Sequence, residues 1–197
     1  MDVNNIKICF SRIDNPIEAF ITPPNDPLAG ILMDQMPKDK IEIRGSIGDK
    51  EFNYEYSLKD QEISMKGEFG GLGFESLGIF NQTAALSGQL GQNRLFCTIK
   101  PDTQGPRNSG MAGDVEVNEK ISYNLTEQNF LVNGSIGGEE LNEVFGLNSD
   151  NTAVVDKGSI GKYEINRSAR PVEGGFLLEG TIGGIPFKEY IIAKSNE

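Results

Sequence analysis

Apolar and polar residues alternate along most of this chain, and the alternation is organised around a recurring tetrad with glycine at both ends. The positions two before and two after the first glycine are usually apolar, whereas the positions between them are largely polar, such as Arg44 and Ser46. A period of two residues is typical of a strand that buries one face. Each tetrad therefore predicts the end of a half-buried β-strand.

The tetrad occurs seven times, at intervals of 21 to 24 residues. A fixed spacing of this size indicates supersecondary units that are stabilised by packing against their neighbours. Every unit keeps the second glycine, and glycine at the first central position is what a two-residue type II′ hairpin turn requires. We assign this structural role to Gly45 and Gly48, Gly67 and Gly70, Gly88 and Gly91, Gly134 and Gly137, Gly158 and Gly161, and Gly180 and Gly183, with Gly110 and Gly113 in the most degenerate unit.

A two-residue turn also fixes the register, because it places the first glycine opposite the residue seven positions later. All seven of these partners are apolar, as expected where a bulky side chain covers the bare backbone of a glycine. They are Phe52, Phe74, Leu95, Val117, Leu141, Ile165 and Phe187. We therefore expect Gly180→Val to overpack against Phe187. The fourth unit departs from the pattern, with Asn108 at a position where an apolar residue belongs.

The segments between the hairpins are rich in turn-forming residues, so the chain is predicted to be all-β, with roughly fourteen short strands in meander order. We expect the seven hairpins to curl with their apolar face inside, into a barrel-like or two-layered β structure. An open solenoid is the competing topology. A closed ring of this size is too wide for side chains alone to fill, so the N-terminal segment, flattening or a ligand has to occupy its interior.

Residues 1–40 lie outside the repeat and are expected to form a cap or plug, while residues 41–197 form the repeat region of the same domain. Residues 5–12 alternate enough to predict a strand. Asn15 and Asp26 each stand directly before a proline, a pattern that predicts helix starts, and we expect helices over 16–21 and 27–36. The second helix would present an apolar face made of Leu28, Ile31, Leu32 and Met36. That face is expected to pack on the core, with a partner-binding helix as the alternative.

Composition narrows the classes of partner. The formal net charge is −11 and histidine is absent, which argues against nucleic acid and anionic membrane surfaces because both require a cationic patch. No window approaches a membrane span, and no signal peptide is evident. The chain as given is expected to be cytoplasmic, with export open if a signal peptide has been removed.

Candidate chemistry is sparse. Without histidine, catalysis would depend on carboxylates, Tyr, Lys or Cys. Cys9 and Cys97 are expected to be buried free thiols, with a disulfide as the alternative. The alternating Asp114, Glu116 and Asn118 contain oxygens that suit calcium but match no known calcium loop. We therefore expect no enzymatic activity, metal or cofactor, and we take a pocket with two converging ionisable side chains as the finding that would overturn this expectation.

These observations favour a non-catalytic β-repeat protein with a structural or protein-binding role. The alternative is a β-barrel that binds a small apolar ligand or, as a lesser option, performs acid–base chemistry on it with a Tyr or a carboxylate. A filled interior favours the first role, and an open apolar cavity with a few convergent polar groups favours the second.

Overall fold

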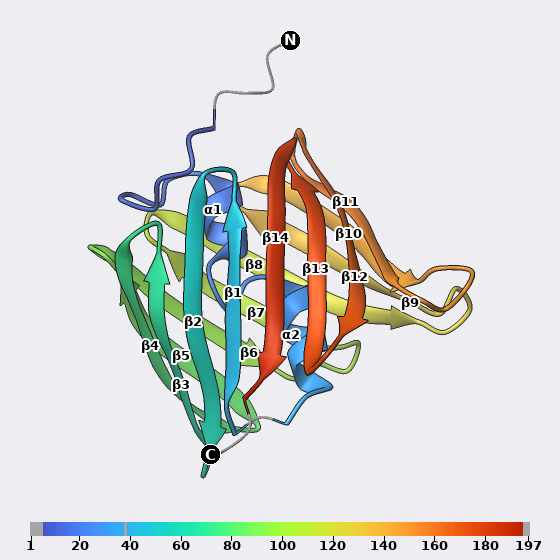
Figure 1. Cartoon of the computed structure of the whole chain (residues 1–197), viewed down its shortest axis with the longest axis horizontal. Helices are drawn as coiled ribbons and strands as arrows, with labels where there is room; N and C mark the ends of the chain where they lie inside the picture. Colours follow the sequence, from blue (N-terminus) through green and yellow to red (C-terminus); the bar gives the residue numbers. More distant parts are fainter. Residues whose placement is uncertain (1–5, 38, 195–197) are drawn as a thin grey trace.

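The computed structural model describes residues 6–37 and 39–194 and shows a closed antiparallel barrel of fourteen strands in chain order, with β14 paired to β1 (Figure 1). This all-β meander confirms the predicted fold class, and closure into a barrel replaces the solenoid alternative. The helices are α1 (Pro16–Ile21) and α2 (Pro27–Asp34). The strands are β1 (Ile41–Ile47), β2 (Lys50–Lys59), β3 (Glu62–Phe69), β4 (Leu72–Asn81), β5 (Thr83–Leu90), β6 (Asn93–Lys100), β7 (Arg107–Ala112), β8 (Val115–Asn124), β9 (Asn129–Ile136), β10 (Glu139–Leu147), β11 (Val154–Ile160), β12 (Tyr163–Val172), β13 (Gly175–Ile182) and β14 (Ile185–Ala193).

Each glycine tetrad ends at a two-residue turn, and the register of every hairpin is the predicted one. Gly134 lies opposite Leu141 and Gly180 lies opposite Phe187, and the other five units pair in the same way. The turn type differs from the prediction in three units. A second glycine follows at positions 71, 138 and 184, where both central residues have positive φ, as in a type I′ turn rather than type II′. A second glycine permits this because it carries no Cβ.

The contact between successive hairpins obeys a second rule. The first glycine of each unit also faces the residue nine positions after the first glycine of the preceding unit, and the closing seam follows the same rule, with Gly45 opposite Glu189. Each hairpin is thus displaced by two residues from the next. This uniform stagger tilts the strands and lets the sheet close on itself without an irregular seam.

These first glycines are required by close backbone approach. A Cβ built on Gly134 would lie 1.9 Å from the carbonyl oxygen of Asn118, and one on Gly180 would lie 2.2 Å from that of Asn166. The obstacle at Gly180 is therefore the backbone of the preceding hairpin, not the Phe187 side chain that the sequence indicated. Glycine repeated at one level lets the sheet bend sharply around the ring.

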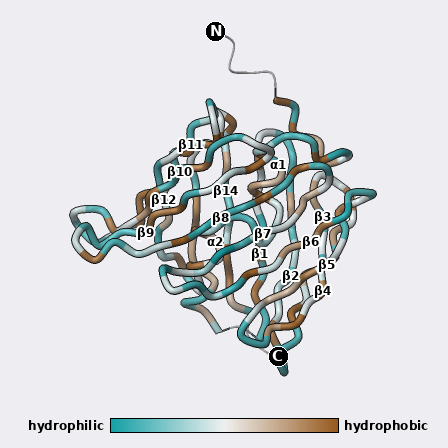
Figure 2. Tube along the Cα trace, turned by 180° about the vertical axis from the view of Figure 1, so that it is seen from behind, coloured by the Kyte–Doolittle hydropathy of each residue, from teal (hydrophilic) through white to brown (hydrophobic). Residues whose placement is uncertain are grey.

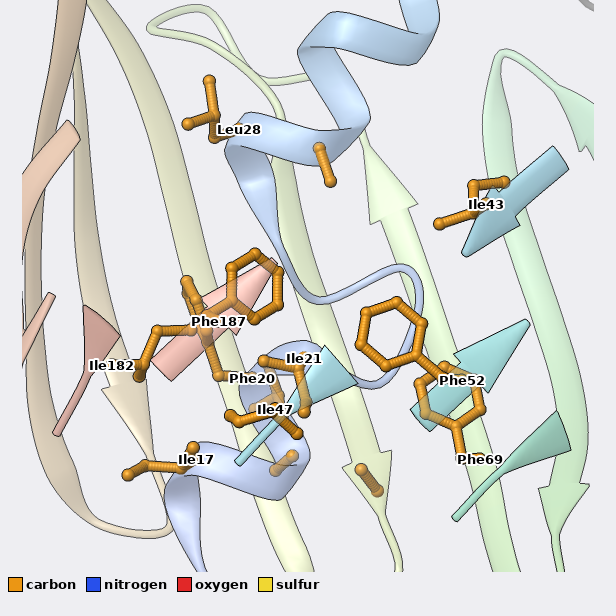
Figure 3. Packing of buried hydrophobic residues seen from close by; sticks show 14 of the residues in the cluster. Ile17, Phe20, Ile21, Leu28, Ile43, Ile47, Phe52, Phe69, Ile182 and Phe187 are labelled. Atoms are coloured by element: carbon orange, nitrogen blue, oxygen red, sulfur yellow. The ribbon is translucent and has the colours of Figure 1, made fainter. Parts of the chain in front are cut away.

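Both helices lie inside the barrel, where Figures 1 and 2 show them between the wall formed by β1, β2 and β14 and the wall formed by β7 and β8. We call residues 16–34 the plug. Side chains of α1 pack against the inner wall in Figure 3, where Ile17 and Phe20 lie beside Ile182 and Phe187. Among the described residues, no helix combines the length and apolar character that crossing a membrane requires.

Both helices begin directly after the capping residues that the sequence predicted, Asn15 and Asp26. The Asn15 side chain accepts a hydrogen bond from the Glu18 N–H at 3.0 Å, and the Asp26 side chain accepts one from the Ala29 N–H at 3.4 Å. Both interactions satisfy backbone donors of a first helical turn. The second helix ends at Asp34, two residues earlier than predicted, although Met36 remains buried.

The strand predicted over residues 5–12 does not form in its described part, residues 6–12, and residue 5 lies outside the described residues. Phe10 has a φ of 56°, and the backbone N–H groups of Cys9 and Phe10 both donate to the Glu18 carboxylate. A closed barrel offers no free edge for an additional strand. This segment therefore caps the barrel as irregular chain tied to α1.

Candidate functional site

Most of the buried polar side chains that the strands contribute lie at one level of the barrel interior. This level is the position nine residues after the first glycine of each tetrad, and all of its members face inward and are buried. We call these residues the inner ring: Tyr54, Ser76, Cys97, Glu119, Glu143, Arg167 and Glu189. They share the orientation of the apolar residues two positions earlier on the same strands, because alternate residues of a strand face the same side.

Arg167 fixes one half of the inner ring to the plug. Its guanidinium donates to Asp156 at 2.7 Å, to Glu143 at 3.1 Å and to both carboxylate oxygens of Asp26, the N-cap of α2. The guanidinium also lies over the ring of Phe20, 5.2 Å from its centroid. A fully buried charge requires such complete pairing. We therefore interpret this half of the inner ring as the anchor that holds the plug in the barrel.

Burial raises the pKa of both Glu143 and Asp156, the two barrel carboxyls beside Arg167. Burial raises the pKa of Glu143 well above its ordinary value, and the nearby Asp156 raises it further, against the lowering effect of Arg167. Burial also raises the pKa of Asp156, while Arg167 counteracts the rise. Of the two, Glu143 is the carboxyl whose pKa lies further above its ordinary value.

The other half of the inner ring forms the floor of a cavity of about 390 Å³. The cavity lies between α2 and the barrel wall, at the end remote from the glycine tetrads. Its walls are apolar, and Ile31 and Met33 of α2 contribute to them. The barrel contributes Ile63, Met65, Ala84, Leu86, Ile99, Ile121 and Phe130. Tyr54, Glu119 and Glu189 of the inner ring line the floor.

Several oxygens at this floor have no hydrogen-bond partner in the protein. One oxygen of Glu119 accepts from the Asn108 amide at 3.0 Å, but its Oε1 is unpartnered. The Oε1 of Glu189 and the Oδ1 of Asn108 are unpartnered as well. The Asn108 amide also donates to Asn25 of the plug at 3.0 Å, which fixes its orientation. Leaving a buried polar atom unpaired costs about 1–3 kcal/mol, so the floor is energetically poised to accept donors.

The two floor carboxyls are protonated at neutral pH. Burial raises the pKa of Glu189 to about 8, with a further contribution from Asp26 and an opposing one from Arg167. Burial likewise raises the pKa of Glu119 to about 8, against the lowering effect of its hydrogen bond from Asn108. Burial, followed by the charge of Glu189, raises the pKa of Tyr54 well above its ordinary value, so its phenol stays neutral.

These pKa shifts predict a pH-dependent stability. Folded Glu119 and Glu189 hold their protons up to about pH 8, whereas the unfolded carboxyls lose theirs near pH 4.3. The native state therefore binds more protons in this window, and each group lowers the free energy of unfolding by up to about 1.4 kcal/mol per pH unit as pH rises. We expect urea denaturation between pH 5.5 and 7.5 to show a shallower decline for the Glu119→Gln, Glu189→Gln double variant. Parallel curves for the variant and the original chain would contradict the assignment.

The floor bears on one expectation from the sequence. No enzymatic activity was expected because histidine is absent and no nucleophile has a base at motif spacing, and a pocket with converging ionisable side chains was named as the finding against it; Glu119, Glu189 and Tyr54 line one pocket. The acidic residues of the ring went unnoticed because acidic positions were assigned to the solvated face. The sequence did contain a signal. The residue nine positions after each first glycine lies two positions from an inward-facing apolar residue, so it also faces inward, and it is an acidic or basic residue in four of the seven units.

Other candidate residues lie elsewhere. None of the tetrad glycines lines the cavity; they shape the sheet that surrounds it. Asp114 pairs with Arg12 at 2.9 Å on the surface, and Glu116 accepts from Asn118 nearby. Within residues 6–37 and 39–194, no group of three or more His, Cys, Asp or Glu side chains is arranged to hold a metal ion. Cys9 and Cys97 are free thiols, and Cys97 is the buried one.

The fold and the site together define a plugged meander barrel with an internal cavity. Comparisons of the chain with protein-family models, curated proteins and solved structures found no match. The function is therefore argued from the geometry of the cavity.

Proposed function

We propose that this protein binds a small, mainly apolar ligand inside the barrel, in the cavity between α2 and the wall. The observation that carries this proposal is an apolar cavity that ends in unpartnered, buried carboxyl oxygens of Glu119 and Glu189. Apolar walls supply the affinity in such sites, and a few converging polar groups orient the ligand. The volume of about 390 Å³ equals that of roughly a dozen water molecules, which suits a ligand of similar size in non-hydrogen atoms.

A filled interior was expected for a structural or protein-binding role, and an open apolar cavity for a ligand-binding role. The plug fills the end of the barrel near the glycine tetrads, where Ile17 and Phe20 are buried, and leaves the other end hollow. An open, mainly apolar cavity favours the ligand-binding barrel, which the sequence ranked second. The mouth of the cavity is marked by Gly30 and Asp34, which line the cavity and are solvent-exposed.

Gly30 provides a direct test of cavity binding. A Cβ at this position would meet no atom within 4 Å, so Gly30→Phe places a ring at the mouth without a backbone clash. We expect small aromatic and alkyl compounds, with 2-phenylethanol as the first probe, to bind the original chain. Titration calorimetry is expected to show binding at least tenfold weaker to Gly30→Phe.

The matched control is Gly73→Phe, which adds the same ring to the outer face of β4, also without a contact within 4 Å. This variant is expected to bind as the original chain does. Equal binding by all three proteins, or no binding by any compound of the set, would refute the proposal. Recovery of the ligand unchanged after long incubation separates binding from the lesser alternative, acid–base chemistry.

A protein-binding role is the second candidate, and a feature of the outer surface favours it. Leu77, Phe96 and Met111 are exposed on β4, β6 and β7, with exposures of 54%, 53% and 41%. Ser87 of β5 lies between Leu77 and Phe96 in register, so the three form one row across four adjacent strands. Large exposed apolar side chains in one row are typical of interaction surfaces. This row and the cavity lie on opposite faces of the wall, so substitutions can address the two roles separately.

A further inference from the structure

Asn108 is a polar residue at a position that is apolar in most repeat units, and it lies on the cavity wall. The position two before the first glycine of each tetrad is buried in all seven units. It is apolar in five of them, and in the sixth unit it is Asp156, which binds Arg167. In the fourth unit it is Asn108, which lines the cavity together with Ile99, its neighbour on β6. A buried amide at such a position requires partners for its polar atoms.

A chain of hydrogen bonds fixes the orientation of the Asn108 amide. The side-chain nitrogen of Asn25 donates to the Ala19 carbonyl at 3.0 Å, so the Oδ1 of Asn25 is the acceptor that faces Asn108. The Nδ2 of Asn108 donates to this oxygen and to the Oε2 of Glu119, at 3.0 Å in both cases. Both N–H groups of Asn108 are therefore used. Because Asn25 sets the orientation, the assignment does not depend on the protonation of Glu119.

The Oδ1 of Asn108 is the remaining polar atom of this side chain. Asn108 is 7% exposed, and its Oδ1 is buried with no hydrogen-bond partner among residues 6–37 and 39–194. An amide oxygen can only accept hydrogen bonds, so a complementary ligand has to supply an N–H or O–H group. A ketone, an ester or a carboxylate leaves this oxygen unpaired, and an unpaired buried oxygen lowers affinity.

The charge state of the cavity floor favours a neutral ligand. Burial raises the pKa of Glu119 and of Glu189 to about 8, so both floor carboxyls are neutral at pH 7. Asp26 is paired with Arg167. No Lys or Arg is among the described residues that line the cavity. A charged ligand would lose its hydration without gaining an opposite charge on the floor, and that loss is costly in an apolar site.

We propose that the ligand is a neutral molecule with an apolar body and a hydrogen-bond donor, an amide N–H or a hydroxyl, and that this donor binds the Oδ1 of Asn108. This inference rests on the proposed function and specifies the class of its ligand and the residue that selects it. The apolar body lies against cavity walls such as Ile63, Met65 and Phe130. Replacement of Asn108 should therefore change which ligand is preferred, while binding of the apolar body persists.

The first test compares probes of similar size on the original chain. The compound 3-phenylpropanamide carries a primary amide, and 4-phenylbutan-2-one keeps the carbonyl but has a methyl group in place of the NH2. An apolar cavity alone would favour the ketone, because it is the more apolar of the two. We expect titration calorimetry at pH 7 to show that the amide binds more tightly than the ketone by about threefold or more. The anion 3-phenylpropanoate has the shape of the amide but no donor, and it should bind about tenfold more weakly than the amide, or not at all.

The second test uses Asn108→Leu, which introduces the residue type that β5 carries at the equivalent position, Leu86. The variant lacks the acceptor, so the ketone should bind it more tightly than the amide. The ratio of the two dissociation constants should shift by about tenfold relative to the original chain. Asn142→Leu, on the outer face of β10, is the matched control and should keep the original order. Thermal unfolding shows whether both variants are folded, and the comparison on the original chain decides the inference if Asn108→Leu is not.

Two results overturn this inference and leave the proposed function standing. The first is ketone binding to the original chain that is at least as tight as amide binding, since the Oδ1 of Asn108 would then obtain its donor elsewhere, for example from water. The second is an unchanged ratio of the dissociation constants in folded Asn108→Leu. In both cases the probes still bind the original chain more tightly than Gly30→Phe. Failure of every probe to distinguish Gly30→Phe from the original chain overturns both proposals.

Discussion

Replacement of Arg167 by alanine is expected to lower the free energy of unfolding by about 3–5 kcal/mol. Arg167 is fully buried and holds Asp26, Asp156 and Glu143 through charge-assisted hydrogen bonds. Removing it leaves several carboxyls buried without a counter-charge, and it also removes the ring contacts to Phe20. The plug loses its strongest attachment to the barrel wall.

Urea denaturation at pH 7 measures this loss. Arg170→Ala on the same strand is the control, since the Arg170 side chain is 56% exposed and lies 3.8 Å from Glu179. A surface pair of this kind contributes about 0–1 kcal/mol. Similar losses for the two variants would show that the buried cluster does not anchor the plug.

Gly180→Val is expected to destabilise the barrel by about 3 kcal/mol or more, through two effects that act together. The added Cβ would lie 2.2 Å from the Asn166 carbonyl oxygen and 2.7 Å from the Arg167 Cα. Both are backbone atoms that cannot rotate away. In addition, Gly180 has a φ of 150°, which a β-branched residue rarely adopts.

The matched control for this prediction is Gly73→Val, which replaces a strand glycine whose Cβ would meet no atom within 4 Å. Its effect should stay within about 0.5 kcal/mol. Thermal unfolding of the two variants side by side gives the comparison. An unchanged melting temperature for Gly180→Val would show that the backbone of β12 can move away from position 180 at no cost in stability, which would contradict this prediction.

The anchor and the cavity share one residue, Asp26. Its carboxylate caps α2, binds Arg167 and lines the cavity. The charge of Asp26 also contributes to the raised pKa values of Glu189 and Glu119. The position of the plug therefore sets both the shape of the cavity and the protonation of its floor.

The sequence by itself determined the local elements of this protein. Seven glycine tetrads placed the turns, and a two-residue loop leaves only one register for the strands beside it, so pairs such as Gly134 with Leu141 followed directly. The starts of α1 and α2 were equally local, because Asn15 and Asp26 cap the turn that immediately follows each of them. These features depend on residues that are neighbours in the sequence, so they could be predicted from one amino-acid sequence alone.

The tertiary structure alone decided closure, the place of the plug and the character of the interior. The seam pairs Gly45 with Glu189, a contact between the two ends of the repeat region that no local pattern specifies. The alternation of residues along each strand predicted which side chains face the barrel interior, but not which groups they contact there. The position of the plug within the ring decides that Arg167 meets three carboxyl groups while the Oε1 of Glu189 meets no hydrogen-bond donor. That position is set by packing between segments more than a hundred residues apart. The same packing left one half of the ring paired and the other half facing an open cavity.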